Sequence, residues 1–339
     1  MTALVVVNAG STSLKLHRVD DDETVTPVAA LEDIRTEPIA AIVHRVVHGG
    51  VQFREPTIID ARVRAAIFAL AAVDPIHNAP ALRAIERTRH LLPEIPEVAV
   101  FDTGFHATMP DEACTYALPA RWRTEWGVRR FGFHGLSVQW CAERVPVARL
   151  VVCHLGGGCS VTAVAGGRSV DTSMGFSPLD GVPGATRSGA VDPQAIIFAL
   201  RSGRLALDAL EHDLNFCSGL LGLGGSTDMR EITAQDGLAL AVFVHRVAAV
   251  VAAMTASLGG LDALAFTAGI GEGSATVRER VCARLGFLGI ALDADRNRAA
   301  TPDTRIDADG APIAVHVIRA REELVAARAT RRLLDGGAR

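Results

Sequence analysis

Apolar positions follow two different periods along this chain, and the alternation predicts strands and helices in turn. Short apolar runs typical of buried strands occur at residues 4–7, 41–47, 98–101, 150–154, 161–164, 263–268 and 314–318. Helical spacing of apolar residues fills 61–70, 79–92, 137–143, 193–202, 236–258, 275–285 and 322–334. Strands that alternate with helices are typical of α/β proteins. Two of the runs continue into hairpins, so we expect mixed sheets flanked by helices.

Turns rich in glycine and hydroxyl residues follow two of the strand runs. One turn lies within residues 8–15 and the other within 156–160, and an alternating run follows each. Glycine allows backbone N–H groups to approach a ligand closely, and successive N–H groups form a concave site for phosphate. Two such turns, one at the start of each half of the chain, predict two similar domains that share one nucleotide.

Basic residues single out the first turn. Lys15 is the only lysine among the 34 Lys and Arg residues of the chain. A lysine is a compact charge on a flexible stem, whereas arginine prefers bidentate partners. We therefore expect Lys15 to act near phosphate. The alternative is a coding bias toward arginine from which one lysine survived by chance.

Composition fits a globular protein of two domains. The chain has 339 residues, 49% of them hydrophobic and 21% charged, with a net charge of −4. This charge gives no electrostatic reason to expect nucleic acid or an anionic membrane as partner. His245 and Arg246 interrupt the longest apolar stretch, 238–261, which favours a core helix over a membrane span.

Cysteine usage and the N-terminus indicate a cytoplasmic protein. The six cysteines form no CxxC pair and have no zinc-site spacing, so we expect reduced and mostly buried thiols. The first residues carry no basic segment of a signal peptide. Residues 20–37 read as a short polar connection, and loops are expected at 156–158, 173–189 and 269–274. The tail from Gly336 is expected to fray.

Three charged residues lie where phosphoryl chemistry would place them. Arg45 ends a predicted strand and precedes glycines, and Arg187 lies among glycine and hydroxyl residues. Guanidinium groups suit the equatorial charge of a transferring phosphoryl group, although both arginines could instead form structural ion pairs. Asp102 follows the strand 98–101 and precedes a turn, which is a position typical of a Mg²⁺ ligand or a base, or else of a cap.

Histidines and a third glycine cluster are further candidates. His134 lies in an aromatic and glycine-rich loop, and could donate to developing negative charge or be a satisfied core imidazole. The same two readings apply to His77 and His154. The glycine cluster 269–274 lies between a strand and a helix, where backbone N–H groups suit a nucleotide. Its spacing does not give the dinucleotide-binding pattern.

Together these segments resemble the acetate kinase family, within the actin and sugar-kinase superfamily. The matching stretches run in order along nearly the whole chain: VNAGSTSLK, HRVVHGG, FDTGFHATMP, RRFGFHGLS, CHLGGGCS, SVDTSMGFSPLDG, TRSG, FTAGIGE, RERVCARLGFLGI and EELVAAR. The resemblance implies two ribonuclease-H-like domains. The first would comprise residues 1–104 and 323–339 in a shortened form, and the second residues 105–322.

The resemblance also implies roles for individual residues. In this family the two turns and the third glycine cluster hold ATP. The implied nucleotide contacts are Asn8, Ser11, Ser13, Lys15, His154, Gly156, Gly157, Gly158, Gly269, Gly271 and Glu272. The implied catalytic residues are Arg45, Asp102, His134 and Arg187. The implied walls of a small acyl pocket are Val47, Ile76, Phe133 and Pro178. Mg²⁺ or Mn²⁺ would be served by Asp102, Asn8 and a C-terminal glutamate, Glu322 in preference to Glu323.

The implied activity is reversible, Mg²⁺-dependent transfer of phosphate between ATP and acetate, which forms acetyl phosphate and ADP, in a homodimer. A carboxylate is already ionised near pH 7 and needs no general base, whereas the hydroxyl acceptor of a sugar kinase does. The alternatives are a propionate or other short-acyl kinase, and a nucleotide-binding paralogue with weak activity or none.

The chain departs from the family pattern at several places. It is shorter between residues 18 and 41. Gly157 and Gly273 stand where the family has asparagine, Val51 replaces a glutamate, and Arg321 replaces the asparagine before the glutamate pair. These changes bear on nucleotide preference and rate more than on the fold.

Overall fold

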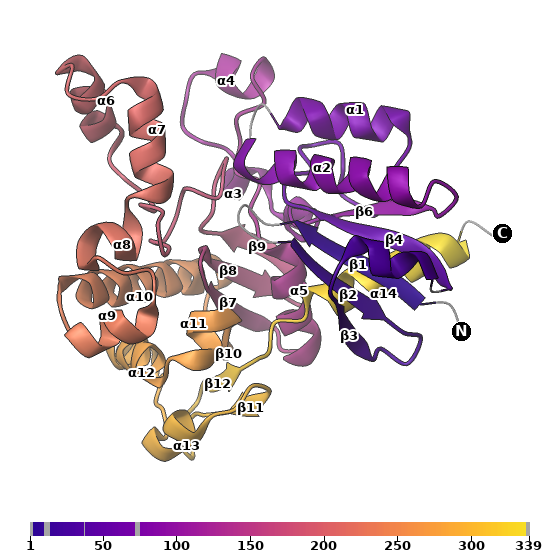
Figure 1. Cartoon of the computed structure of the whole chain (residues 1–339). Coiled ribbons are helices and arrows are strands. Elements are labelled where there is room, and N and C mark those ends of the chain that lie inside the picture. Colours follow the sequence, from indigo (N-terminus) through magenta and orange to yellow (C-terminus); the bar gives the residue numbers. More distant parts are fainter. Residues whose placement is uncertain (1–2, 10–13, 37, 72–74, 337–339) are drawn as a thin grey trace. The chain divides into compact units, whose positions relative to one another are not determined.

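A computed structural model describes two compact units (Figure 1). Residues 3–9, 14–36, 38–71 and 75–336 are described. Unit 1 comprises Met1–Ala107, Phe133–Trp140 and Arg321–Arg339, and unit 2 comprises Thr108–Gly132 and Cys141–Ala320. The sequence predicts independently folded domains of residues 1–104 with 323–339 and of residues 105–322. These boundaries remain a prediction.

Unit 1 is built on a mixed sheet of six strands, in the order β3-β2-β1-β4-β6-β5. Its strands are β1 (Ala3–Ala9), β2 (Leu14–Val19), β3 (Val25–Val28), β4 (Ile39–Val46), β5 (Thr57–Ile58) and β6 (Glu97–Phe101). Strands β1, β4 and β6 are parallel neighbours, so their carboxyl ends meet at one edge of the sheet.

Helices pack against both faces of this sheet. Helix α2 (Pro75–Leu91) packs against β1 and β4 and against α1 (Ala61–Leu70). Helix α14 (Glu322–Gly336) also contacts β1 and β4. Side chains alternate along a strand, so His44 lies against Thr88 of α2 while Arg45 points to the opposite face and meets Glu322 of α14. The face that carries Arg45 is therefore the α14 face.

Unit 2 contains a second mixed sheet of six strands, in the order β11-β12-β10-β7-β8-β9. Its strands are β7 (Arg149–Leu155), β8 (Cys159–Ala165), β9 (Arg168–Thr172), β10 (Ala263–Thr267), β11 (Thr304–Arg305) and β12 (Ala314–Val317). Strands β7, β10 and β12 are parallel neighbours, while β7 and β8 form the predicted hairpin.

The central helix of unit 2 is α10 (Leu238–Leu258), which packs against β7, β8 and β9. Its length and composition would allow it to cross a membrane, but half of its most apolar window is buried within the structure. It is the core helix that the sequence predicts. The other helices named for this unit are α3 (Asp111–Cys114), α4 (Ala120–Thr124), α6 (Pro193–Arg201), α7 (Leu207–Phe216), α8 (Gly219–Gly224), α9 (Met229–Gln235), α11 (Ala268–Gly273), α12 (Ala275–Arg284) and α13 (Ala294–Ala299).

The α/β class with mixed sheets is confirmed, and two local predictions are wrong. Residues 20–37 are not merely a connection, because β3 pairs with β2 and a 3₁₀ helix, η1 (Leu31–Thr36), buries Leu31 and Ile34 in the core. Residues 269–274 are not simply a loop, because α11 occupies most of them. Residues 337–339 of the expected frayed tail lie outside the described part.

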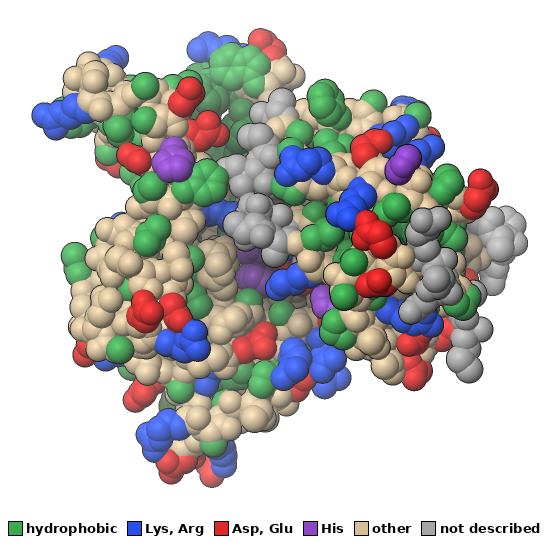
Figure 2. Space-filling model, in the orientation of Figure 1, with side chains coloured by type: hydrophobic (Ala, Val, Ile, Leu, Met, Phe, Trp, Pro, Cys, Tyr) green, Lys and Arg blue, Asp and Glu red, His purple; other side chains and the backbone are tan. Residues whose placement is uncertain are grey.

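Charged side chains of both signs are mixed on the surface, and most of the cysteines are buried, as the composition suggests. On the face shown in Figure 2, acidic and basic side chains are interspersed. All six cysteines are free. Cys217 is exposed, and the other five are buried.

Candidate functional site

The Arg45 guanidinium is the centre of a polar cluster in unit 1. Its Nε donates to Asp102 Oδ1 at 2.9 Å, and its Nη2 donates to the other oxygen of the same carboxylate. Its Nη1 donates to Asn8 Oδ1 at 3.0 Å and lies 3.3 Å from Glu322 Oε2. The structure therefore brings together four residues that the sequence singled out from distant segments.

The sheet explains why these four side chains meet. Asn8 is near the end of β1, Arg45 is near the end of β4, and the two are paired in register. Asp102 follows β6 directly, and its N–H donates to the Val46 carbonyl at 3.0 Å. Glu322 begins α14, which lies across the same face. A carboxyl edge of parallel strands is a common place for ligand sites in open α/β folds.

Two carboxylates control the charge of Arg45. Burial alone would lower the pKa of its guanidinium, but the negative charges of Asp102 and Glu322 outweigh burial and raise this pKa. Arg45 is therefore positively charged near pH 7. Its donors point at protein oxygens, so an incoming anionic ligand would share or replace these contacts.

The segment that follows α4 and leads into the next helix carries His134. His134 itself has a φ of 60° and therefore a left-handed backbone. The next residue, Gly135, begins α5 (Gly135–Arg144) and donates its N–H to the Asp102 carbonyl at 3.1 Å. A Cβ on Gly135 would lie 2.0 Å from that carbonyl oxygen, so only glycine allows the approach. The backbone next to His134 is thereby attached to Asp102, the partner of Arg45.

Of the expected acyl-pocket walls in unit 1, two are described. Val47 is 9% exposed and Phe133 is 1% exposed, and the Phe133 ring lies edge-on to the His48 ring with 5.6 Å between centroids. The side chains of Ile76 and His77 lie outside the described part. Pro178 belongs to unit 2 and is buried there. The pocket as a whole remains a prediction.

The first phosphate turn is described only at its ends. Asn8 joins the Arg45 cluster, and Lys15 is exposed on β2. Ser11 and Ser13 lie outside the described residues. The hairpin around the turn, β1 paired with β2, is as predicted.

Unit 2 contains a cavity of about 640 Å³ beside the second phosphate turn and α11. Gly156, Gly157 and Gly269 are among the residues that line it, and their role in a nucleotide site remains a prediction. The wall also includes Asp228 and Arg230, which sequence reasoning missed. Asp228 caps α9 by accepting from the Arg230 N–H at 2.8 Å, and this cap before a helical pattern was a signal that could have been used.

The loop that carries Arg187 is attached to the second phosphate turn. The Ala185 N–H donates to the Gly157 carbonyl at 2.9 Å, and the Gly184 N–H donates to the Arg187 carbonyl at 3.0 Å. Arg187 is half-buried. Burial raises the pKa of the Cys159 thiol to about 12, against the lowering effects of its hydrogen bond to the Gly156 carbonyl and of the Arg187 charge. His154, in β7, is buried beside this turn.

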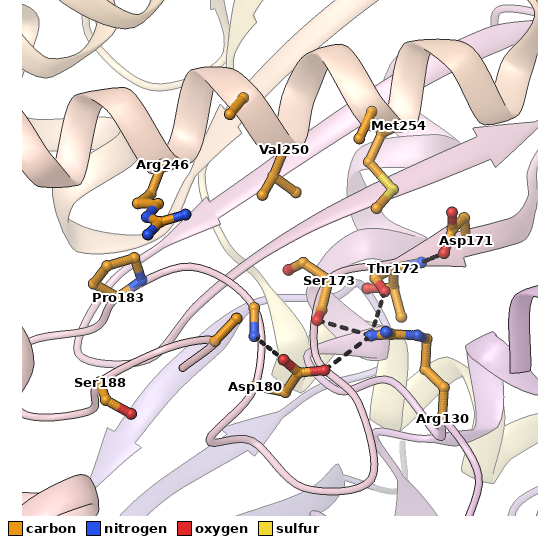
Figure 3. A pocket seen from close by; sticks show the side chains of 14 residues that line it. Arg130, Asp171, Thr172, Ser173, Asp180, Pro183, Ser188, Arg246, Val250 and Met254 are labelled. Atoms are coloured by element: carbon orange, nitrogen blue, oxygen red, sulfur yellow. Dashed lines mark hydrogen bonds and ion pairs between the residues drawn. The ribbon is translucent and has the colours of Figure 1, made fainter. Parts of the chain in front are cut away.

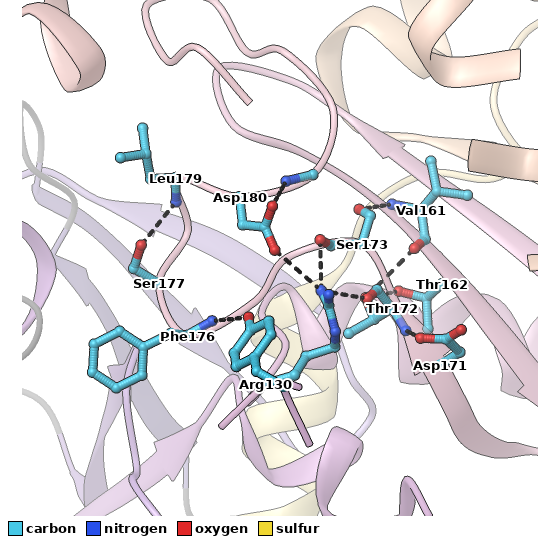
Figure 4. Close-up of polar contacts among 12 residues, drawn as sticks. Arg130, Val161, Thr162, Asp171, Thr172, Ser173, Phe176, Ser177, Leu179 and Asp180 are labelled. Atoms are coloured by element: carbon cyan, nitrogen blue, oxygen red, sulfur yellow. Dashed lines mark hydrogen bonds and ion pairs between the residues drawn. The ribbon is translucent and has the colours of Figure 1, made fainter. Parts of the chain in front are cut away.

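A second cavity in unit 2, of about 320 Å³, lies between the 173–189 loop and α10 (Figure 3). Arg130 lines it and donates to the carbonyls of Thr172 at 3.0 Å and Ser173 at 2.8 Å, and its Nη1 lies 3.4 Å from Asp180 (Figure 4). The charged groups here thus fix the loop that carries Pro178 and Arg187.

Arg278, a buried arginine that sequence reasoning did not single out, supports the third glycine cluster. It donates to the carbonyls of Gly271 at 2.9 Å and Glu272 at 2.8 Å, and to the Asn297 side chain at 2.8 Å. Glu272 Oε1 in turn accepts from the Ala268 N–H at 3.0 Å. Glu272 is therefore engaged in fixing α11, and these contacts explain why a glycine-rich segment forms a helix.

The predicted residues thus fall into two groups. The structure assembles Asn8, Arg45, Asp102 and Glu322 in unit 1, with the His134 segment attached to Asp102. It places Gly156, Gly157 and Gly269 around a cavity in unit 2, with the Arg187 loop attached to Gly157. Among the described residues, no three His, Cys, Asp or Glu side chains form a ready-made metal site.

Comparison with known proteins agrees with the sequence resemblance. The model of the acetokinase family matches residues 29–328. An acetate kinase of Protochlamydia amoebophila is 44% identical over 297 residues, which cover 84% of this chain and 75% of that protein. A crystal structure of a propionate kinase from Francisella tularensis has a TM-score of 0.90 at 34% identity, and the match covers 97% of this chain and 99% of that one.

A third relative bears on the length of the chain. The acetate kinase of Clavibacter sepedonicus is 41% identical over 388 residues, with 97% of this chain and 98% of that protein covered. The alignment is longer than the 339 residues of this chain, so it includes positions where this chain has no residue. That the missing positions lie between residues 18 and 41 remains a prediction. On the family model and these identities, the chain belongs to the acetokinase family.

Proposed function

We propose that this protein is an acetate kinase, which transfers phosphate reversibly between ATP and acetate with Mg²⁺. The observation that carries the proposal is the Arg45 guanidinium, held at the carboxyl edge of the unit 1 sheet by Asp102, Asn8 and Glu322. Phosphoryl transfer needs little covalent chemistry from the protein and depends on positioning and on fixed charge. An arginine held by these three side chains supplies a fixed positive charge and a fixed position for the phosphoryl group.

The state of Asp102 favours a carboxylate as acceptor. Both of its carboxylate oxygens bind Arg45, and the side chain is almost completely buried. A general base takes up a proton, and a proton on Asp102 would remove its ion pair with Arg45. A metal ion could instead share the carboxylate with the guanidinium, because each oxygen has a second lone pair. Acetate brings its own negative charge and needs no base, so the arrangement suits acetate better than a sugar hydroxyl.

The oxygen donors around Arg45 suit a divalent ion. Mg²⁺ prefers oxygen ligands and is commonly held by one or two carboxylates together with the substrate phosphates. Asp102, Glu322 and Asn8 offer two carboxylates and an amide oxygen, so these residues would hold Mg²⁺ or Mn²⁺, in keeping with the family. The bound ion would neutralise charge on the phosphate oxygens.

The remaining roles are proposed for single residues. Arg187 and His134 donate to the transferring phosphoryl group along with Arg45. Backbone N–H groups of the two glycine turns, with Lys15, hold the phosphates of ATP, and the cavity beside Gly157 and Gly269 takes the nucleoside. Val47, Ile76, Phe133 and Pro178 enclose the methyl group of acetate.

Two alternatives differ in substrate or in activity. A propionate or other short-acyl kinase would have the same charged residues and a wider acyl pocket. A non-catalytic nucleotide-binding paralogue would have no need of the intact Arg45, Asp102 and Glu322 set. We prefer the acetate kinase because this set is present and because the described pocket walls, Val47 and Phe133, are bulky and closely packed.

A coupled assay tests the proposal and separates the alternatives. Acetate, propionate and butyrate are offered as acceptors, and ATP, GTP and pyrophosphate as donors, with and without Mg²⁺. The highest kcat/KM is expected for acetate with ATP and Mg²⁺. Higher kcat/KM with propionate would assign the first alternative, and no transfer with any pair would leave only the second.

We further propose that the protein is a cytoplasmic homodimer. Unit 2 exposes large apolar side chains on its helices, including Phe198 on α6 at 57% and Leu207 on α7 at 67%. None of the residues of α6 is buried. An exposed apolar surface of this kind is typical of an association site.

A further inference from the structure

The backbone of His134 is in a conformation that few residues with a side chain adopt. Its φ of 60° lies in the left-handed region, which disfavours residues with a Cβ. Strained positions of this kind persist where neighbouring contacts over-determine them, and they cluster at functional sites. Here two hydrogen bonds, one on each side of His134, hold the backbone in this conformation.

The first bond comes from a buried histidine. His106 Nε2 lies 2.9 Å from the carbonyl oxygen of Phe133, the residue that precedes His134. The second bond lies on the other side, where the Gly135 N–H donates to the Asp102 carbonyl at 3.1 Å. The peptide groups before and after His134 are thus both fixed, and the second is fixed to the aspartate that binds Arg45.

The chemistry of the first bond determines the state of His106. A carbonyl oxygen can only accept, so Nε2 must carry the hydrogen. His106 is 1% exposed, and this burial lowers its pKa to about 4, against the opposing effects of the Phe133 carbonyl and the Asp102 charge. The ring is therefore neutral near pH 7, and its hydrogen is committed to Nε2.

We propose that His106 is a positioning residue for the phosphoryl transfer, which acts by holding the Phe133 carbonyl and thereby the His134 side chain. The inference rests on the proposed function of the site. His106 donates one hydrogen bond and moves no proton. Without that bond the Phe133–His134 peptide can rotate, the strained φ relaxes, and the His134 imidazole leaves the place where it would donate to the transferring group.

The test is a double-mutant cycle between His106 and His134. His106→Leu removes the donor at similar volume, and His106→Gln keeps an N–H donor near the position of Nε2. We expect His106→Leu to lower kcat by roughly tenfold or more while KM for ATP changes by less than about twofold, because misplaced catalytic groups cost rate rather than nucleotide binding. His106→Gln should recover most of the loss.

The cycle then distinguishes positioning from general support of the fold. In a His134→Ala background, His106→Leu should lower kcat by less than about twofold, because the group on which it acts is already absent. His44 is the matched control, since it is equally buried at 1% exposed but binds Glu97 and Thr88. The effects of His44→Gln and His134→Ala on the activation free energy should add, so that their fold-changes in kcat multiply.

A measurement that does not depend on activity completes the test. The ¹⁵N chemical shifts of the wild-type His106 ring at pH 7.5 should show the hydrogen on Nε2. The Nδ1–H tautomer, an unchanged kcat in a folded His106→Leu variant, or an additive cycle with His134 would each overturn the inference. If His106→Leu does not fold, His106→Gln decides: near wild-type kcat supports the inference, and a loss of tenfold overturns it. Absence of acetate kinase activity in the wild type would instead defeat the proposed function, and the tautomer would still test the hydrogen bond.

Discussion

At the scale of single residues, the site depends on Arg45 holding its charge in place between three oxygen-bearing partners. Asp102 binds it through both carboxylate oxygens, so the guanidinium is held in one orientation before a substrate enters. Preorganised charge of this kind stabilises a transition state without a cost of reorganisation at the moment of reaction.

Removing either proposed transfer arginine should abolish most activity. We expect Arg45→Ala and Arg187→Ala each to lower kcat by roughly 10³-fold, because an arginine that stabilises a transferring phosphoryl group contributes about that much. Arg62→Ala, an exposed arginine on α1, is the control and should leave kcat unchanged. Steady-state kinetics with acetate and ATP gives the answer, and near wild-type turnover in both variants would remove the proposed role.

The acyl preference should respond to Val47. A methylene in an apolar pocket is worth only about 1–3 kcal/mol, so propionate should be a weaker substrate rather than an excluded one. Val47→Ala should widen the pocket and lower KM for propionate. The acetate to propionate ratio of kcat/KM measures the effect, and an unchanged ratio would mean that Val47 is not a pocket wall.

Gly157 should accept the asparagine that the family resemblance leads us to expect at this place. A Cβ built on Gly157 meets no atom within 4 Å, and its φ lies outside the left-handed region. Gly157→Asn should lower KM for ATP by roughly threefold to tenfold, since one neutral hydrogen bond contributes about 0.5–1.5 kcal/mol. Gly286→Asn, at another open glycine, is the control. Loss of activity in Gly157→Asn would instead indicate a loop rebuilt for another donor.

Residues at strand ends could be predicted because their surroundings are local in sequence. Arg45 lies near the end of one recognisable apolar run and Asp102 directly follows another, and both reach the cluster. Glu322 was accessible only through the family resemblance, because nothing near it in the sequence marks it. His106 and Arg278 were missed, since their partners, Phe133 and Asn297, are set by tertiary contacts that no periodicity reports.

At the scale of elements, the site is built from strand ends and from short helices held by side chains. Three parallel strands of unit 1 bring Asn8, Arg45 and Asp102 to one edge. In unit 2, α11 has too many glycines to be stable alone, because each costs about 1 kcal/mol relative to alanine. The hydrogen bonds from Arg278 to the carbonyls of Gly271 and Glu272 supply the stability that the sequence of α11 lacks.

Removing Arg278 should therefore destabilise the protein and weaken ATP binding. Arg278→Met loses bonds from a charged donor and leaves the Gly271 and Glu272 carbonyls without it, at a cost of about 2–4 kcal/mol. Arg280→Met on the same helix is the control, because its partner Asp236 is exposed. Thermal unfolding and KM for ATP are the measurements. Equal effects of the two substitutions would contradict the role given to Arg278.

Elements with strong apolar patterns were predictable, and weakly patterned ones were not. The core helix α10 and the buried strands β1, β7 and β10 appear where the sequence places them. Strand β3 was missed because it is a short, partly exposed edge strand with a proline, and its formation depends on the hydrogen bonds of β2.

At the scale of the whole molecule, the two units share an architecture of mixed six-stranded sheets while differing in what they carry. Unit 1 has the charged cluster, and unit 2 has the large cavity. Apolar residues left exposed on unit 2 suggest how copies of the chain associate.

The proposed homodimer should depend on these apolar residues. Size-exclusion chromatography with light scattering should give a mass of about two chains for the wild type. The variant with both Phe198→Glu and Leu207→Glu should have the mass of a single chain. Phe68→Glu is the control, because Phe68 is similarly exposed at 72% but lies on α1 of unit 1. A monomeric wild type, or a dimer that the paired substitution leaves intact, would contradict the proposal.

The burial of the cysteines has a practical consequence. Burial raises the pKa of Cys141, Cys159 and Cys282 to about 12 and that of Cys153 well above its usual value, so these thiols are protonated and enclosed. Cys217 alone among the cysteines is exposed, and the next residue, Ser218, donates its N–H to the carbonyl of Thr186 in the Arg187 loop. The thiolate is the species that reacts with electrophiles. A maleimide dye added to the unmodified protein would therefore attach at one position, and its fluorescence would report on the Arg187 loop without any engineered cysteine.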